Sequence, residues 1–343
     1  MMRLPLPWLF ALTGGALALL LVGSLATGPM ALSFSESLRA LFAGQESGIA
    51  AHKLLIVQEI RLPRTLLCIA VGGILGLCGA VMQGLFRNPL ADPGIIGVSG
   101  GAALGAALAI VLLAPLGQQW QSLLGIGLLP LLAFLGGALT TTLVYLLGTR
   151  EGGTSVTVML LAGVAITALS GAVIGLLTYL ADDQMLRNLS LWQMGTLAAG
   201  KPVDVALALA TLIVLLLLLM RDANPLNALL LGEGEARHLG VNVQSLKRRL
   251  ILLTAAGVGV AVAVAGMIGF VGLVVPHLVR LLAGPNHVRL LPLSALLGAA
   301  LLLGADMLAR TLLAPAELPV GIITALLGAP FFIWLLVKGR RTL

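Results

Sequence analysis

The sequence predicts an all-α membrane protein with about ten transmembrane helices, because it is very apolar and carries little charge. Hydrophobic residues make up 59% of the 343 residues and charged residues only 10%. Soluble globular domains have about 45–50% apolar and about 25% charged residues, so this class is excluded. Disorder requires low hydrophobicity and high charge, and is excluded as well. A membrane-crossing helix needs about 20 residues, and the apolar content allows roughly ten of them.

Apolar runs bounded by glycine, proline and charge define eight of these helices directly. The predicted spans are 8–27, 64–84, 94–114, 126–148, 156–180, 203–220, 292–313 and 320–337. The stretch 251–282 is flanked by basic residues on both sides, which the positive-inside rule places in the cytoplasm. We therefore expect a hairpin of two short helices there, turning near 266–269, with each arm reaching about 22 Å.

Ten spans put both chain ends on the same side of the membrane. Arg3 near one end and Lys338, Arg340 and Arg341 near the other agree with a cytoplasmic placement of both. The formal net charge of +7 has the same explanation, so we expect no nucleic-acid partner. The first apolar run is interpreted as an uncleaved helix rather than a signal peptide. The whole chain, 1–343, is expected to be one transmembrane domain.

Glycines repeat at intervals of four residues in several predicted spans. Small residues at this spacing let helix backbones approach closely in lipid, so we expect them to pack helices together within the bundle. The pairs and triplet are Gly72/Gly76, Gly97/Gly101/Gly105 and Gly171/Gly175.

Two motifs that suggest enzymes do not support an enzymatic function. The segment from Gly195 to Lys201 has phosphate-loop spacing, but Pro202 follows where Mg²⁺ needs a hydroxyl. No other segment could hold ATP, so any ATP-driven activity would need a partner chain. A Gly-x-Ser-Gly motif around Ser99, with His277 as its base, is the best protease alternative, but packing and helix-end effects explain both residues. The four histidines show no metal-ligand spacing, and we expect neither catalytic residues nor a metal site.

Charged residues at the predicted outer face are more informative. Arg61 and Arg64 flank Leu62-Pro63 at the outer start of the second span, against the positive-inside trend. Asp306 and Arg310 are four residues apart and share one helix face, as either a structural ion pair or a functional one. The three arginines predict a positive cluster on the external face, suited to acidic groups of an external partner.

The segment 221–250 is the longest polar insertion and is predicted to be cytoplasmic. Its helical stretches are interrupted by glycine and end in basic residues, which indicates two short helices joined by a turn. Such a segment is typical of a docking surface.

Four motifs in order resemble the permease subunits of binding-protein-dependent ABC importers for iron chelates, haem and vitamin B12. They are RLPR at 61–64, GAVMQGLFRNPLADP at 79–93, GFVGLVVPH at 269–277 and ELPVGIIT at 317–324. The resemblance implies the type II ABC importer architecture: a homodimer in the bacterial inner membrane with a translocation path at the two-fold axis. It also implies two cytoplasmic ATPase subunits that hold ATP-Mg, a periplasmic binding protein, and no cofactor on this chain.

The resemblance also implies roles for particular residues. Arg61, Arg64 and Arg310 match positions that pair with glutamates of the binding protein. The segment 229–242 matches the coupling helices that enter the ATPase, and the loop before the fifth span matches the inner gate. The expected residues are Glu233, Glu235, Arg237 and Gly240 for coupling, and Thr154, Ser155 and Thr157 for the gate.

The substrate is less well determined than the family. The run 328–336 is close to the pattern of vitamin B12 permeases, whereas an apolar path with few polar groups suits a flat macrocycle. We expect haem, with a siderophore or vitamin B12 as alternatives. An ion-coupled secondary transporter is the alternative from a different class; it would need intramembrane carboxylates or inverted repeats, and Asp306 is the only plausible mid-span carboxylate.

Overall fold

The computed structural model describes residues 5–30, 32–42, 50–114, 127–150, 153–198 and 200–340. Arg3, Arg341 and Ala199 of the phosphate-loop-like segment, which enter the predictions above, lie outside these ranges. Within them the chain is helical except for one two-stranded antiparallel hairpin and connecting turns. The predicted all-α class is confirmed.

Seven helical segments in these ranges are long and apolar enough to cross a membrane, and three shorter apolar helices accompany them. The long ones are α1 (Leu6–Ala26), the continuous stretch that ends in α4 (Leu62–Leu85), α7 (Leu128–Gly148), α8 (Val156–Leu180), α10 (Pro202–Arg221), α13 (Val243–Ala265) and α15 (His287–Thr311). The shorter ones are α5 (Val98–Val111), α14 (Val271–Ala283) and the part Val320–Leu335 of α16 (Val320–Arg340). Each predicted span thus contains a helix.

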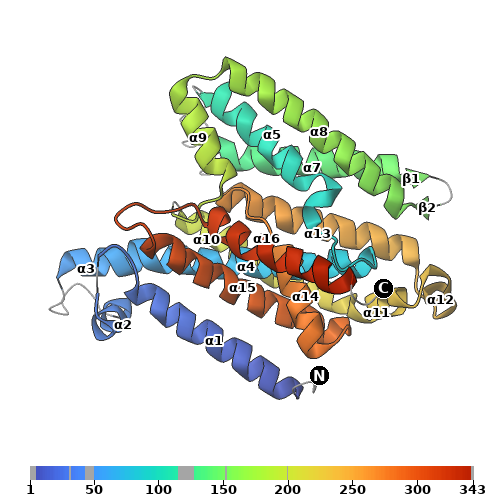
Figure 1. Ribbon diagram of the computed structural model, residues 1–343, viewed down its shortest axis with the longest axis horizontal. Helices are drawn as coiled ribbons and strands as arrows, with labels where there is room; N and C mark the ends of the chain where they lie inside the picture. Colours follow the sequence, from blue (N-terminus) through green and yellow to red (C-terminus); the bar gives the residue numbers. More distant parts are fainter. Residues whose placement is uncertain are drawn as a thin grey trace.

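Short elements occupy the connections at the two ends of the bundle. They are α2 (Phe34–Phe42), α3 (Ala51–Leu55), the π-helix η1 (Ile56–Arg61), the 3-10 helix η2 (Pro93–Ile96), β1 (Thr149–Arg150), β2 (Gly153–Thr154), α9 (Asp183–Gln193), α11 (Ala223–Leu230) and α12 (Glu233–His238). The hairpin, α11 and α12 lie at one end, and α2 and α3 at the other (Figure 1). The start of α1 and the end of α16 lie toward the end that carries α12 (Figure 1).

Of the two short helices expected in the hairpin, one is short and the other is long. α13 has 23 residues, which corresponds to about 35 Å and is enough for a full crossing. Only α14, with 13 residues, is short. The turn falls at 266–270 as expected, with Gly266 and Phe270 at positive φ. The difference arises because the basic run at 247–249, interpreted as a flank, is part of α13, and Lys247 is buried.

The segment 221–250 contains the two short helices that were predicted. α11 and α12 are joined at Gly232, whose φ of 126° belongs to the left-handed region that favours glycine. The last part of the segment is the start of α13, so the polar connection is shorter than expected.

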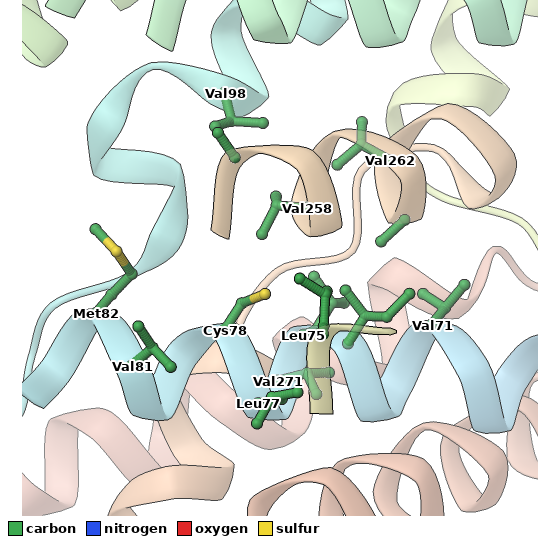
Figure 2. Packing of buried hydrophobic residues seen from close by; sticks show 14 of the residues in the cluster. Val71, Leu75, Leu77, Cys78, Val81, Met82, Val98, Val258, Val262 and Val271 are labelled. Carbon is green, nitrogen blue, oxygen red and sulfur yellow. The ribbon is translucent and has the colours of Figure 1, made fainter. Parts of the chain in front are cut away.

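Helix α4 lies in the centre of the bundle and is surrounded by other helices. Its apolar side chains belong to one buried cluster with Val98 of α5, Val258 and Val262 of α13 and Val271 of α14 (Figure 2). Cys68 and Cys78 are buried and free on this helix. α13 separates α4 from the group formed by α5, α7, α8 and α9, and α1 lies on the opposite side (Figure 1).

The glycines of α4 bring it into backbone contact with its neighbours. A Cβ at Gly72 would collide with the Gly298 carbonyl of α15, and one at Gly79 with the Gly272 carbonyl of α14. The packing expected for Gly72/Gly76 is therefore confirmed. In contrast, Gly171 and Gly175 of α8 have no neighbouring atom within 4 Å. The expectation that this pair packs inside the bundle is wrong, because that face of α8 points outward.

Candidate functional site

A buried cluster of charges joins α4 and α15 at the end of the bundle that carries α2. Asp306 is fully buried and lies between two arginines. Arg64 donates from Nε and Nη2 to Asp306 Oδ1 at 3.0 and 2.9 Å. Arg310 Nε lies 3.0 Å from Asp306 Oδ2 one helical turn away. The pairing of Asp306 with Arg310 was expected from their spacing, whereas the contact with Arg64 was not.

The same cluster holds the end of α1. Arg61 Nη1 donates to the carbonyl oxygens of Leu25 and Ala26 at 2.7 and 2.9 Å. Arg310 donates to the Ser24 hydroxyl at 2.7 Å and to the Thr27 carbonyl at 3.1 Å. The last carbonyls of a helix lack intrahelical partners and carry partial negative charge, so cationic donors stabilise them. These arginines therefore fix α1 against α4 and α15.

The three arginines predicted to form a positive cluster are buried in this chain. Arg61, Arg64 and Arg310 are only 4%, 6% and 2% exposed. The physical reason is that each guanidinium finds acceptors inside the chain, in Asp306 and in the carbonyl oxygens of α1. One contact of the cluster reaches the surface: Arg64 Nη1 donates at 2.7 Å to Glu317, whose side chain is 34% exposed. Sequence reasoning quoted Glu317 within a motif but assigned it no role.

Helices α2 and α3 at the same end are joined by an ion pair between Glu36 and Lys53. The hydrogen bond from Lys53, together with those from Ser33, lowers the pKa of Glu36 to about 2. This carboxylate therefore stays charged at any physiological pH, and the pair gives α2 a fixed position beside the charge cluster.

At the opposite end, α11 is attached firmly to the transmembrane helices. Arg249 of α13 donates from Nε to Asp222 at 2.8 Å, next to the start of α11. Asn227 accepts from the His287 backbone amide at 2.8 Å and contacts His287 Nδ1 at 2.9 Å. α11 is thereby tied to the starts of both α13 and α15.

Helix α12 projects from this anchored base. Glu235, Arg237 and Gly240 are exposed and Glu233 is half-buried. Leu231 and Leu239, on either side of the helix, are 68% and 64% exposed. Gly240 has a φ of 82° and open space around it. The four predicted coupling residues thus share one protruding surface, and the two leucines, which sequence reasoning missed, add an apolar component.

The three predicted gate residues lie at the junction of the hairpin and α8. Thr154 is buried, its hydroxyl is 3.1 Å from that of Thr149, and its carbonyl accepts from Lys247 at 2.9 Å. Ser155 is the N-cap residue of α8, and Thr157 is exposed in its first turn. These residues face the same end of the bundle as α12 (Figure 1).

In the described ranges no group of three or more His, Cys, Asp or Glu side chains could hold a metal ion. The groups that do gather are ion pairs and helix caps, which fix helices relative to one another. Ten apolar helices with a rigid polar cluster at one end and a protruding helix at the other define a polytopic membrane protein with a contact surface at its α12 end.

Comparisons with known proteins identify the family. A model of the FecCD transport family matches residues 16–338. The chain is 47% identical over 328 residues to the hemin transport system permease protein HmuU of Yersinia pestis, covering 95% of this chain and 94% of that one. It is 45% identical over 297 residues to the cobalamin import system permease protein BtuC of Halobacterium salinarum, covering 87% and 77%.

A solved structure gives the same answer. The inward-facing conformation of a putative metal-chelate type ABC transporter matches with a TM-score of 0.82 and 34% identity, covering 97% of this chain and 100% of that one. The chain therefore belongs to the FecCD transport family, as its four motifs predict. It is a multi-pass permease subunit rather than an enzyme, which excludes the alternative of a serine protease with Ser99 and His277.

Replacing Asp306 with asparagine tests the buried cluster. The variant leaves two buried arginines without their shared carboxylate, which we expect to lower the free energy of unfolding by about 3–5 kcal/mol. A thiol-reactive dye reports thermal unfolding of the purified chain, because Cys68 and Cys78 are buried and become reactive when it opens. Glu317→Gln is the control, since a partly exposed pair contributes only about 0–1 kcal/mol. Equal melting temperatures for the two variants would contradict this account.

Proposed function

We propose that this chain is the permease subunit of a haem importer, and carries haem across the bacterial inner membrane by ATP-driven alternating access. The observation that carries the proposal is the 47% identity, over almost the whole length of both chains, to a hemin permease. Apolar side chains dominate the transmembrane helices, which suits a flat, largely apolar macrocycle. ATP-Mg is then bound by separate ATPase subunits, because the relatives of this chain are permease components of transport systems.

We propose further that two copies form the transport path, and that the full chain, 1–343, acts as a single domain. The support comes from α8, where Gly171 and Gly175 face open space. Small residues four apart allow close approach of a second helix in lipid, where an unpaired groove brings no advantage. Exposed leucine and tyrosine side chains continue this face toward the end of α8.

We propose that the ATPase subunits bind at α12, with Glu233, Glu235, Arg237 and Gly240 in the contact and both chain ends in the cytoplasm. A protruding helix with charged residues between two exposed leucines suits an interface with an apolar core and a polar rim. The adjacent residues Thr154, Ser155 and Thr157 serve as the inner gate. ATP must bind the two conformations with different affinity to shift their populations.

The periplasmic binding protein is proposed to dock at the opposite end, near Arg61, Arg64 and Arg310. Arg61 and Arg310 are buried and donate to oxygens at the end of α1, so Arg64 is the one that can engage a partner. Its contact with Glu317 is partly exposed. A carboxylate of the binding protein can take the place of Glu317 on Arg64 without uncovering a buried charge.

Charge reversal at Glu317 tests this docking site. Glu317→Lys removes the carboxylate that competes for Arg64 and adds a positive charge that attracts an incoming carboxylate, so affinity for the loaded binding protein should rise, by up to about tenfold. Asp183→Lys is the matched control, because Asp183 is exposed on α9 and undergoes the same charge change. Surface plasmon resonance on nanodiscs measures both affinities. Equal gains in the two variants would assign the effect to overall charge and contradict the docking site, as would an unchanged or lower affinity for Glu317→Lys.

The absorption spectrum of the cognate binding protein, as isolated from cells, tests the substrate. Haem gives an intense Soret band, which is the expected result. A corrinoid spectrum would contradict the haem proposal and favour vitamin B12, the second candidate, which the 45% identity to a cobalamin permease supports. A catecholate charge-transfer band would instead identify an iron siderophore as the substrate.

A further inference from the structure

Lys247 in the second turn of α13 is a buried cation with partners on two other elements. Its side chain is 3% exposed. Nζ donates to the backbone carbonyl of Thr154 in β2 at 2.9 Å and to Glu233 Oε1 in the first turn of α12 at 2.6 Å. A buried ammonium is stable only when its hydrogen bonds are satisfied, so its position depends on both partners.

Gln244, almost one turn earlier on α13, completes the connection to the hairpin. Its Oε1 accepts from the Thr154 backbone amide at 3.0 Å. Both backbone groups of Thr154 are therefore held by side chains of α13. Gly153 next to it has a φ of 109°, and a Cβ there would collide with the Gln244 amide. The β1–β2 hairpin is therefore held against α13 by Gln244 and Lys247, and a side chain larger than glycine at position 153 would not fit there.

The hairpin is connected to α8 through Ser155, which follows Thr154. Ser155 is the N-cap of α8, so a movement of Thr154 displaces the start of this helix. Between α12 and the hairpin lies a cavity of about 420 Å³, and its lining includes Gly153, Arg237 and Gly240. Across the described residues, the polar contacts between α12 and β2 all pass through Lys247.

We propose that Lys247 is the positioning residue that transmits movement of α12 to the inner hairpin and α8. This inference rests on the proposed binding of the ATPase at α12. When the ATPase pulls on α12, Glu233 moves with it, and Lys247 carries the displacement to the Thr154 carbonyl. The hairpin and the start of α8 then move together because Thr154 and Ser155 are adjacent.

Lys247→Met removes the ammonium while keeping an unbranched apolar stem of similar length. Glu233 is 33% exposed and can be solvated by water after the change, so no buried charge is stranded. The variant should therefore fold but lose the connection. Lys247→Arg keeps a cationic donor and should restore it. Arg248→Met is the matched control, because Arg248 is the next residue, also cationic, and exposed.

The experiment measures the labelling rate of Val158→Cys by a polar maleimide in nanodiscs that hold the permease with its cognate ATPase. Val158 lies in the first turn of α8 and is 39% exposed, whereas Cys68 and Cys78 are buried and do not react. MgATP with vanadate should change the rate at least about fivefold in the Val158→Cys chain, in Arg248→Met and in Lys247→Arg. In Lys247→Met this response should disappear while ATP hydrolysis stays at the level of the Arg248→Met control.

A full response in Lys247→Met would overturn the proposal, as would the absence of any response in the Val158→Cys chain. A parallel loss of ATP hydrolysis and response in Lys247→Met would assign the residue a purely structural role and overturn it too. If that variant cannot be purified, Glu233→Ala removes the acceptor on α12 and should abolish the response. Failure of the ATPase to associate with the unsubstituted chain would instead contradict the proposed function itself.

Discussion

The close packing of α4 against α15 and α14 is the constraint on which the rest of the bundle depends. In lipid the helices gain little from the hydrophobic effect, so they associate through van der Waals packing and polar contacts. Gly72 and Gly298 allow the backbones of α4 and α15 to touch, and Gly79 and Gly272 do the same for α4 and α14. A methyl group at Gly72, Gly79 or Gly298 would collide with a backbone carbonyl of the facing helix and push the two helices apart, whereas one at Gly272 would need only a small shift.

This packing determines where charge can be placed. Because α4 and α15 lie so close, Arg64 and Asp306 meet in a buried site, and Arg310 completes the cluster with the end of α1. The cluster thereby ties α1, α4 and α15 together at the end of the bundle that carries α2. The opposite end is built differently, because α11 is anchored by several contacts while α12 is held mainly through Glu233 and Lys247.

The sequence predicted the helices better than the contacts between them. Hydropathy placed the ten spans, and four motifs identified the family, because both signals are local in the chain. The Asp306–Arg310 pair was predictable from its spacing of four, whereas the Arg64–Asp306 contact spans 242 positions and has no local signal. For the same reason the burial of Arg61 was missed, since its acceptors belong to α1. The length of α13 was misjudged because a buried lysine within a basic run looks like a cytoplasmic flank.

The central claim is that transport by this chain is powered by ATP on a partner subunit. Uptake of haem into proteoliposomes, with binding protein outside and ATP inside, tests it most directly. The account predicts uptake that requires ATP and stops when either the ATPase or the binding protein is omitted. Uptake by the chain alone, driven by a proton or sodium gradient, would contradict the account and identify a secondary transporter.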